Sequence, residues 1–228
     1  MAKQPKHRNA ADTKKRILEA AEAEFAARGF DGARLGRIAK SASVQQALIH
    51  HYFADKAGLY REVIDRALSS ITTEGWDILA RTVRSVSLSK DDRPRAMRMT
   101  ESELRPMVLA FVELLQRFFL QHRAVLAIVA SESRAETEDD VAMELVRVRV
   151  RPVADATTAY LEALRKAGEI RSDVDVQKLC ISAISMVAFP LLEPTFLSAV
   201  WPIDPASKKY VEATRNEIVE MLVRRILP

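Results

Sequence analysis

The sequence predicts an all-α protein in which a small N-terminal three-helix domain is joined by a long connector helix to a larger helical domain. Only 6 of the 228 residues are glycine, and hydrophobic (48%) and charged (29%) residues stand in the balance of a globular protein. Apolar residues recur at helical spacing along most of the chain. Residues 1–60 hold eleven Lys and Arg against six Asp and Glu. This basic excess indicates a polyanionic partner for the N-terminal domain, although a solvated charged tail is the alternative.

The first expected helix covers residues 13–28. Ile17, Leu18 and Phe25 lie on one face of it, and Gly29 follows as a stop signal. Two short helices then follow, Leu35–Ala42 and Gln45–Tyr52. Helices of this length are marginal on their own, so they must be stabilised by packing. Their apolar residues are Leu35, Ile38, Ala39, Val44, Ile49 and Phe53.

A fourth helix is expected from Lys56 to about Val83, with Asp55 as its N-cap. Because it leaves the small domain and enters the large one, it is a natural connector. We therefore expect a domain of residues 1–58 and a domain of residues 59–228. The polar, proline-ended stretch Ser85–Arg95 reads as a loop.

Periodicity in the larger domain predicts further helices and an acidic break at Glu136–Asp140. The segment Val146–Pro152 alternates with period two, as a strand does, but a lone strand would have no partner. We therefore expect a helix disturbed at Pro152. The expected helices are Glu103–Gln121, Arg123–Ala135, Ala154–Lys166, Val176–Leu192 and Ala206–Ile226.

The last two of these helices are the candidates for a homodimer interface. The helix Val176–Leu192 is apolar on all sides, which is unusual for a helix with one solvated face. The final helix offers a set of apolar residues to a two-fold partner. They are Val211, Ile218, Met221, Leu222 and Ile226.

Two short helices joined by a tight turn, after a first helix, form a helix-turn-helix layout for reading DNA. This segment resembles the TetR (tetracycline-repressor) family. The resemblance rests on Thr13-Lys-Lys-Arg-Ile-Leu-Glu-Ala-Ala, Phe25-Ala-Ala-Arg-Gly-Phe-Asp, Ile38-Ala-Lys-Ser-Ala-Ser-Val and Leu48-Ile-His-His-Tyr-Phe-Ala-Asp-Lys56. It implies a three-helix DNA-binding domain, a connector helix, a helical ligand-binding domain and a homodimer.

Spacing on the second short helix separates an inward face from an outward one. Val44, Ile49 and Phe53 face inward, so glutamine, alanine and histidine side chains are left to meet base edges or phosphates. Lys56, in the first turn of the next helix, lies where phosphate is favoured. The expected DNA-binding residues are Arg34, Arg37, Gln45, Gln46, Ala47, His50, His51, Tyr52 and Lys56.

The segment also departs from the family pattern. Ser43 replaces the turn glycine, and a left-handed backbone there costs about 1 kcal/mol more than with glycine. Arg34 and Gln45 occupy the two helix-cap positions in place of small hydroxyl residues. Gly36 weakens its short helix, and His50 replaces the customary tyrosine.

Enzyme, metal and membrane functions lack sequence support. The chain has no GxxxxGK[ST] or GxGxxG loop and no HExxH motif. No histidine has a carboxylate three or four residues before it, so no metal site and no cofactor are expected. The single Cys180 lies in an apolar run and reads as a buried thiol. The longest uncharged stretch, Leu179–Leu192, is too short to span a bilayer, so a cytoplasmic protein is expected.

The expected function is a DNA-binding transcriptional regulator, a repressor released from a pseudo-palindromic operator by a small apolar or amphipathic effector. Aromatic and methionine residues at helical spacing are usually core, but some line cavities. The candidates for an effector pocket are Met107, Phe111, Phe118, Met186 and Phe189. The alternative is a DNA-binding regulator without a small-molecule effector, controlled by a protein partner.

Overall fold

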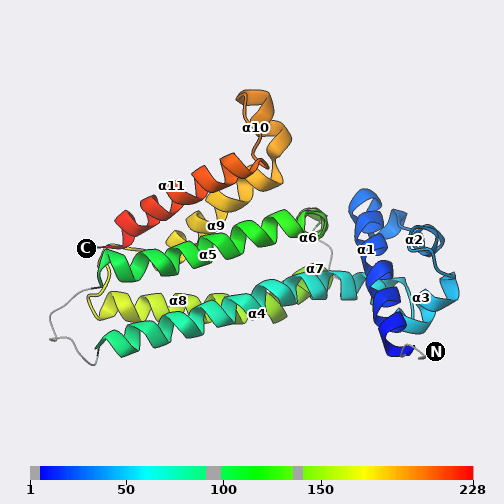
Figure 1. Ribbon diagram of the computed structural model, residues 1–228, viewed down its shortest axis with the longest axis horizontal. Helices are drawn as coiled ribbons and strands as arrows, with labels where there is room; N and C mark the ends of the chain where they lie inside the picture. Colours follow the sequence, from blue (N-terminus) through cyan, green and yellow to red (C-terminus); the bar gives the residue numbers. More distant parts are fainter. Residues whose placement is uncertain (1–5, 91–98, 136–140, 228) are drawn as a thin grey trace, which may run out of the picture. The chain divides into compact units, whose positions relative to one another are not determined.

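The computed structural model describes residues 6–90, 99–135 and 141–227, and every regular element in these ranges is helical (Figure 1). The predicted all-α class is therefore confirmed. The elements are α1 (Lys6–Gly32), α2 (Leu35–Ser41), α3 (Gln46–Phe53), α4 (Lys56–Lys90), α5 (Glu101–Gln121), α6 (Arg123–Ala135), α7 (Val141–Leu145), the π-helix η1 (Val146–Val150), α8 (Arg151–Lys166), α9 (Val176–Leu192), α10 (Pro194–Val200) and α11 (Lys208–Ile226).

The chain forms two compact units that differ from the expected division at residue 58. The first unit combines residues up to Ser69 with 122–148, and the second combines 70–121 with 149–228. The chain passes between them within α4, at the break between α5 and α6, and within η1. Packing therefore adds α6 and α7 to the N-terminal helices. The division into a DNA-binding domain of residues 1–58 and a ligand-binding domain of residues 59–228 stays a prediction.

The core of the first unit lies where α1, α2, α3 and the start of α4 meet. Phe25 of α1 packs edge-on against Tyr60 of α4, with ring centroids 4.9 Å apart. On its other side α1 packs against α6. The buried apolar residues from the four N-terminal helices include Ile17, Leu18, Ala21, Phe25, Ile38, Ala39, Ile49, Phe53, Leu59, Tyr60, Val63 and Ile64.

Helix α1 extends beyond the predicted residues 13–28 at both ends. Gly29, with φ 67° and ψ 179°, breaks the helix as the stop signal predicts, and a further helical turn follows this kink to Gly32. The extra turn is held by Phe30, whose ring lies 6.3 Å from Phe25 and 5.0 Å from Tyr60. The stop at Gly29 is therefore confirmed, and packing of Phe30 on the core holds the turn beyond it.

The second unit is built around α5, with α9 and α11 packed against it. Three polar contacts fix α11 antiparallel to α5. Arg105 pairs with Glu220 at 2.6 Å, Arg215 pairs with Glu113 at 3.0 Å, and the Gln116 amide donates to the Val211 carbonyl at 3.0 Å. These partners pair in opposite chain directions, so they set the register of the two helices.

This packing corrects the apolar set expected on the last helix for a partner chain. Ile218, Leu222 and Ile226 are buried inside the protomer, because they lie on the side of α11 that packs into the unit. Of the five residues named, only Met221 is exposed.

Two other segments differ from prediction. Helix α4 continues to Lys90, so the expected loop Ser85–Arg95 begins later, and its residues 91–95 lie outside the described residues, as does the acidic break 136–140. The segment before Pro152 is helical, as predicted. Its disturbance is the π-helical turn η1, and Pro152 lies in the first turn of α8, where a missing N–H costs little.

No single helix among the described residues is long and apolar enough to cross a membrane. The bent pair of α9 and α10 passes the test of length and composition when the two helices are taken together.

Candidate nucleic-acid interface

The turn between α2 and α3 has the geometry of a glycine-type helix end, built on a serine. Ser43 has φ 54°, its N–H donates to the Lys40 carbonyl, and the Val44 N–H donates to the Ala39 carbonyl. These two bonds form a Schellman motif in which Ser43 holds the position that glycine usually takes. The predicted left-handed backbone at Ser43 is confirmed.

The two expected cap positions are also confirmed, and neither uses its side chain. Arg34 precedes α2 and Gln45 precedes α3, both with extended backbone, and neither side chain accepts a hydrogen bond from the helix. Their side chains therefore stay exposed beside the helices.

The turn from α3 to α4 is tighter still. Ala54 has φ 62° and ψ −63°, and the Asp55 N–H donates to the Phe53 carbonyl across it at 2.7 Å, which defines a strained γ-turn. The Asp55 carboxylate accepts from the Gly58 N–H at 2.8 Å and caps α4, as predicted. A Cβ on Gly58 would lie 2.2 Å from the Phe53 carbonyl oxygen, so this position requires glycine.

These turns hold α3 with one face in the core and the other exposed. Ile49 and Phe53 are buried, as predicted. The exposed residues are Gln45, Gln46, Ala47, Leu48, His50 and His51, while Tyr52 is half-buried with its ring 5.2 Å from that of His51. Leu48 is exposed as well, although it was not among the residues expected to contact DNA.

The histidines differ in their surroundings. The His50 ring donates through Nδ1 to the Ala54 carbonyl at 2.9 Å, since a carbonyl oxygen can only accept. This bond ties His50 to the strained turn. His51 points its ring toward Tyr52.

Arg37 is part of the scaffold of the first unit. Its guanidinium donates to the Glu24 carboxylate at 2.6 Å and to the Gly32 carbonyl at 2.7 Å. Glu24 also accepts from the Arg34 backbone N–H at 3.1 Å. Burial raises the pKa of the Glu24 carboxyl, but these hydrogen bonds outweigh it and the net shift is downward. An ionised Glu24 thus joins α1 to the start of α2.

Lys56 also has partners within the first unit. Its ammonium donates to the Asp31 carbonyl at 3.2 Å and lies 4.6 Å from the centre of the Phe30 ring. The lysine therefore links the first turn of α4 to the end of α1.

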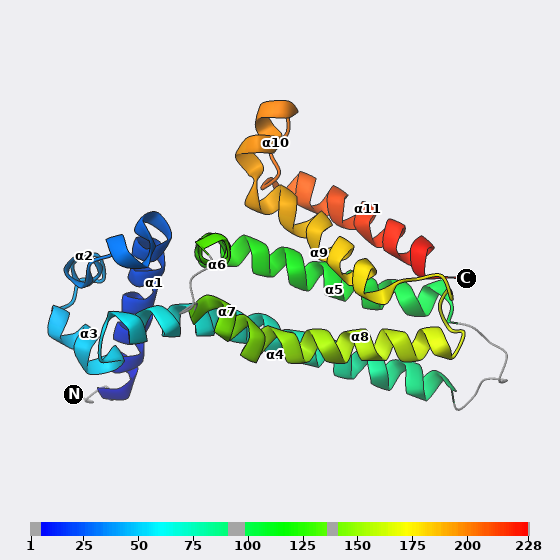
Figure 2. The ribbon, with the colours of Figure 1, turned by 180° about the vertical axis from the view of Figure 1, so that it is seen from behind.

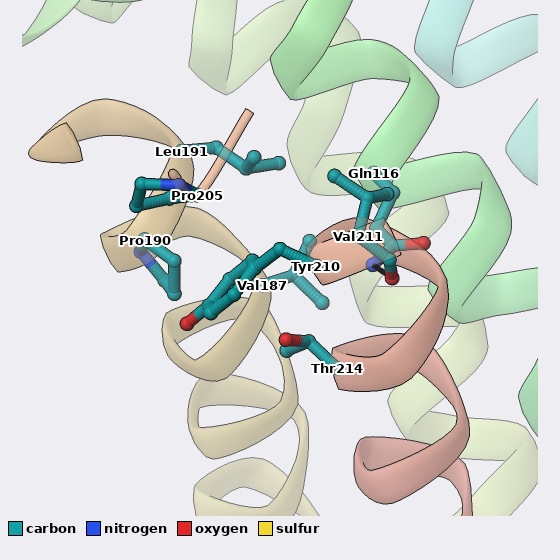
Figure 3. A pocket seen from close by; sticks show the side chains of 8 residues that line it. All are labelled: Gln116, Val187, Pro190, Leu191, Pro205, Tyr210, Val211 and Thr214. Carbon is teal, nitrogen blue, oxygen red and sulfur yellow. Dashed lines mark hydrogen bonds between the residues drawn. The ribbon is translucent and has the colours of Figure 1, made fainter. Parts of the chain in front are cut away.

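The five residues expected to line an effector pocket do not come together at one described cleft. Phe118 is buried beside Phe119, Phe189 is half exposed on α9, and Met107, Phe111 and Met186 are partly buried. Figure 3 shows a small, open cleft between α5, the end of α9 and the start of α11. Its lining residues are Gln116, Val187, Pro190, Leu191, Pro205, Tyr210, Val211 and Thr214.

Within the described ranges, no three His, Cys, Asp or Glu side chains are grouped so as to hold a metal ion. Burial raises the pKa of the half-buried Cys180 thiol, which keeps it protonated and unreactive.

Sequence comparison links both parts of the chain to one family. Residues 17–63 match the family described as bacterial regulatory proteins, tetR family, and residues 106–222 match the tetracyclin repressor-like C-terminal domain. The chain is 38% identical over 73 residues to the HTH-type transcriptional repressor SCO4008 of Streptomyces coelicolor, a match to 28% of this chain and 38% of that relative's length. It is 24% identical over 219 residues to the uncharacterized HTH-type transcriptional regulator YdgC of Bacillus subtilis, covering 95% of this chain and 94% of YdgC.

Solved structures of transcriptional regulators share the fold. The structure of the ketosteroid transcriptional regulator KstR2 of Mycobacterium tuberculosis matches with a TM-score of 0.59 at 18% identity, covering 100% of this chain and 98% of that one. The second family match alone spans more than half of the chain. The exposed face of α3, the helix-turn-helix that holds it and these matches lead to one conclusion: the chain belongs to the TetR family and is a DNA-binding transcriptional regulator, not an enzyme.

Proposed function

We propose that the protein is a repressor whose helix α3 reads a pseudo-palindromic operator in the major groove of double-stranded DNA. The observation that carries the proposal is the row of exposed residues on α3, Gln46, Ala47, Leu48, His50 and His51. They lie on the face of the helix away from the buried Ile49 and Phe53. Gln46 can pair bidentately with adenine, and Ala47 and Leu48 can contact a thymine methyl. His51 is exposed for a base or a phosphate. A regulator of this kind acts in the cytoplasm, where the DNA is.

Arg34, Gln45 and Tyr52 lie beside this row and are proposed to contact the DNA backbone. The intramolecular bonds of Arg37 and Lys56 give these residues a second role, which is to hold α2 and α4 in place for phosphate contact. His50, tied to Ala54 through Nδ1, keeps Nε2 for a phosphate or a base.

The test is selection of bound sequences from a random DNA pool, followed by anisotropy titrations. Gln46→Ala should cost about 1–3 kcal/mol on the selected operator and little on random DNA. Lys56→Ala should weaken binding to all sequences and reduce the salt slope by about one. Equal affinity of the wild type for selected and random duplexes would contradict sequence-specific repression.

We further propose a homodimer that pairs the α9 helices of two protomers. Ile181, Ile184 and Leu192 form an exposed apolar stripe along α9, opposite the buried Ala183. A stripe of this kind on both partners is self-complementary about a two-fold axis. Such a dimer would read two half-sites about 34–36 Å apart, or a multiple of this distance.

The effector is proposed to be a small apolar or amphipathic molecule bound in the second unit. The Tyr160 hydroxyl is buried there and has no hydrogen-bond partner among the described residues. Burial, with a smaller effect of Glu169, raises the pKa of Tyr160, so the hydroxyl is a neutral donor for a polar atom of a ligand. KstR2, a ketosteroid transcriptional regulator with the same fold, also supports an apolar effector. The alternative, a regulator controlled by a protein partner, needs no such pocket.

Screening a metabolite library by thermal shift and by DNA-binding anisotropy distinguishes control by a small-molecule effector from control by a protein partner. A true effector raises the melting temperature and lowers DNA affinity, and near-complete release requires it to favour the non-binding state by about 5.5 kcal/mol. Tyr160→Phe should weaken its binding while leaving DNA affinity without effector unchanged. Ligands that stabilise the protein and leave DNA affinity unchanged would exclude this mode of control.

A further inference from the structure

Helix α10 leaves its largest apolar side chains exposed. It follows α9 after a bend of 79° and packs on α9 through the buried Leu197. Figures 1 and 2 show it extending away from α5, beyond the end of α9 and the start of α11. Phe196, Val200 and Trp201 are 55%, 52% and 53% exposed.

The exposed group continues from α10 onto α9. The rings of Phe189 and Phe196 form an edge-on pair with centroids 6.1 Å apart, and Phe189 is 49% exposed. A half-exposed aromatic ring offers about 100 Å². Together with Val200 and the α9 stripe (Ile181, Ile184 and Leu192), these rings expose roughly 600 Å² of apolar surface, at the upper limit for a monomer.

The size of this surface matches what a dimer needs. A standard interface buries about 800 Å² on each partner, and a homodimer interface is about 65% apolar, so roughly 500 Å² of apolar surface is required. The α9 stripe alone provides less than half of the exposed area. The remainder lies on Phe189 and α10.

The charge pattern indicates the kind of partner. Between Lys178 and Asp204 the only charged residue is Glu193, so the partner must be uncharged and apolar where it meets this surface. No Lys or Arg occurs between Lys178 and Lys208, whereas interfacial membrane helices are usually rich in them. A second copy of this chain presents the same uncharged surface by identity.

We propose that α10 is a dimerisation arm that packs Phe196, Val200 and Trp201 onto a second copy of this chain. The arm would enlarge the interface that pairs the two α9 helices. This inference rests on the proposed homodimer. In a two-fold assembly the arm of each protomer lies on its partner, so each of these side chains acts twice.

Trp201 reports on its own burial. The chain has two tryptophans, Trp76 and Trp201, so Trp76→Phe leaves Trp201 as the only one. In this variant we expect Trp201 emission at short wavelength in the dimer. On dilution the emission should shift to long wavelength. The protein concentration at the midpoint of this shift should equal the one at which sedimentation shows dimers dissociating into monomers. Long-wavelength emission from a protein of dimeric mass would overturn the proposal.

Substitutions separate the arm from the α9 stripe. Phe196→Glu should raise the dimer dissociation constant at least about 100-fold, because two aromatic contacts are lost. Val148→Glu, at an equally exposed apolar residue of the first unit, is the matched control and should leave it unchanged. Circular dichroism checks folding, and if Phe196→Glu does not fold, the Trp201 measurement decides.

The remaining outcomes are also decisive. If Ile184→Glu yields monomers and Phe196→Glu does not, the dimer stands and the arm is wrong. If neither variant changes the mass of a dimeric wild type, both proposals fail. Flotation of the wild type with phosphatidylcholine vesicles, lost in Phe196→Glu without a change of mass, would show a lipid-binding role and overturn the arm.

Discussion

Ser43 shows how one side chain can make a helix-turn-helix less stable without changing its shape. It adopts φ 54° and still completes both hydrogen bonds of the Schellman motif. A left-handed conformation costs a non-glycine residue about 1–2 kcal/mol, and glycine gives back about 0.4–1 kcal/mol through the entropy of the unfolded chain.

Ser43→Gly should therefore stabilise the first unit by about 0.5–1 kcal/mol. Native-state hydrogen exchange of the α2 and α3 amides measures this locally, and slower exchange is the expected result. Lys40→Gly, at an exposed helical position of α2, is the control and should speed exchange. No change in Ser43→Gly would mean that the serine side chain compensates for its backbone.

Leu48 should add thymine preference to the operator. A leucine on the exposed face of α3 has only one base-edge group that it can favour in the major groove, the C5 methyl of thymine. Replacing each thymine of the selected operator by deoxyuracil removes one methyl group, worth about 0.8 kcal/mol or roughly 4-fold in affinity per half-site.

Leu48→Ala should lose the response at one position of each half-site at which the wild type responds. Ala47→Gly should keep the response at that position and lose it only at a thymine whose methyl group Ala47 itself contacts. If Leu48→Ala and the wild type lose affinity equally at every substituted thymine, Leu48 does not contact a methyl group.

At the scale of the element, the turn between α3 and α4 fixes the direction of the reading helix. The γ-turn at Ala54, the Asp55 cap and the contact of Gly58 with the Phe53 carbonyl all lie within six residues. A methyl group on Gly58 must displace backbone, because the carbonyl oxygen would be 2.2 Å from it.

Gly58→Ala should cost about 1–3 kcal/mol of stability and lower operator affinity at temperatures where the protein is still folded. Gly36→Ala is the matched control. At Gly36 a Cβ would meet the Gln46 side chain at an ordinary 3.5 Å, so the helix should gain about 0.5–1 kcal/mol. Thermal unfolding and anisotropy measure both. A Gly58→Ala protein with unchanged stability and affinity would show that the turn is not a constraint.

Sequence reasoning located elements well where a local signal marks their ends. Asp55 caps α4, and the Asp175 carboxylate accepts the Lys178 N–H at the start of α9, which begins at the predicted residue. Gly168, with φ 75°, follows α8 where a stop was expected. The misses lie where tertiary packing decides. A further turn held by Phe30 follows the break at Gly29, and the proline-containing stretch after α9 forms α10.

The buried residues that support the DNA-binding face could be predicted from the sequence. The exposed residues of that face could be predicted only in part. Ile49 and Phe53 are buried, and their spacing of four residues, which places them on one face of α3, predicts this burial. The engagement of Arg37 with Glu24, thirteen residues earlier, depends on how α1 and α2 pack, and no local pattern encodes that. The partition of α6 and α7 into the first unit is likewise a long-range property.

At the scale of the whole molecule, the proposed homodimer would hold two copies of α3 at a fixed spacing. If the dimer through α9 fixes both DNA-binding domains, simultaneous contact with two half-sites raises the affinity by a factor of about 10²–10⁴ over a single site. Because B-DNA turns once in about 10–10.5 base pairs, an insertion of five base pairs between half-sites places them on opposite faces of the duplex.

The wild type should then bind the lengthened operator no more tightly than a single half-site, as measured by anisotropy at fixed salt. The monomeric Ile184→Glu variant should bind the original and the lengthened operator alike, because it never used both half-sites at once. A wild type that tolerates the insertion would mean that the connection between α4 and the dimer is flexible, and that effector control cannot act by changing the spacing of the two reading helices.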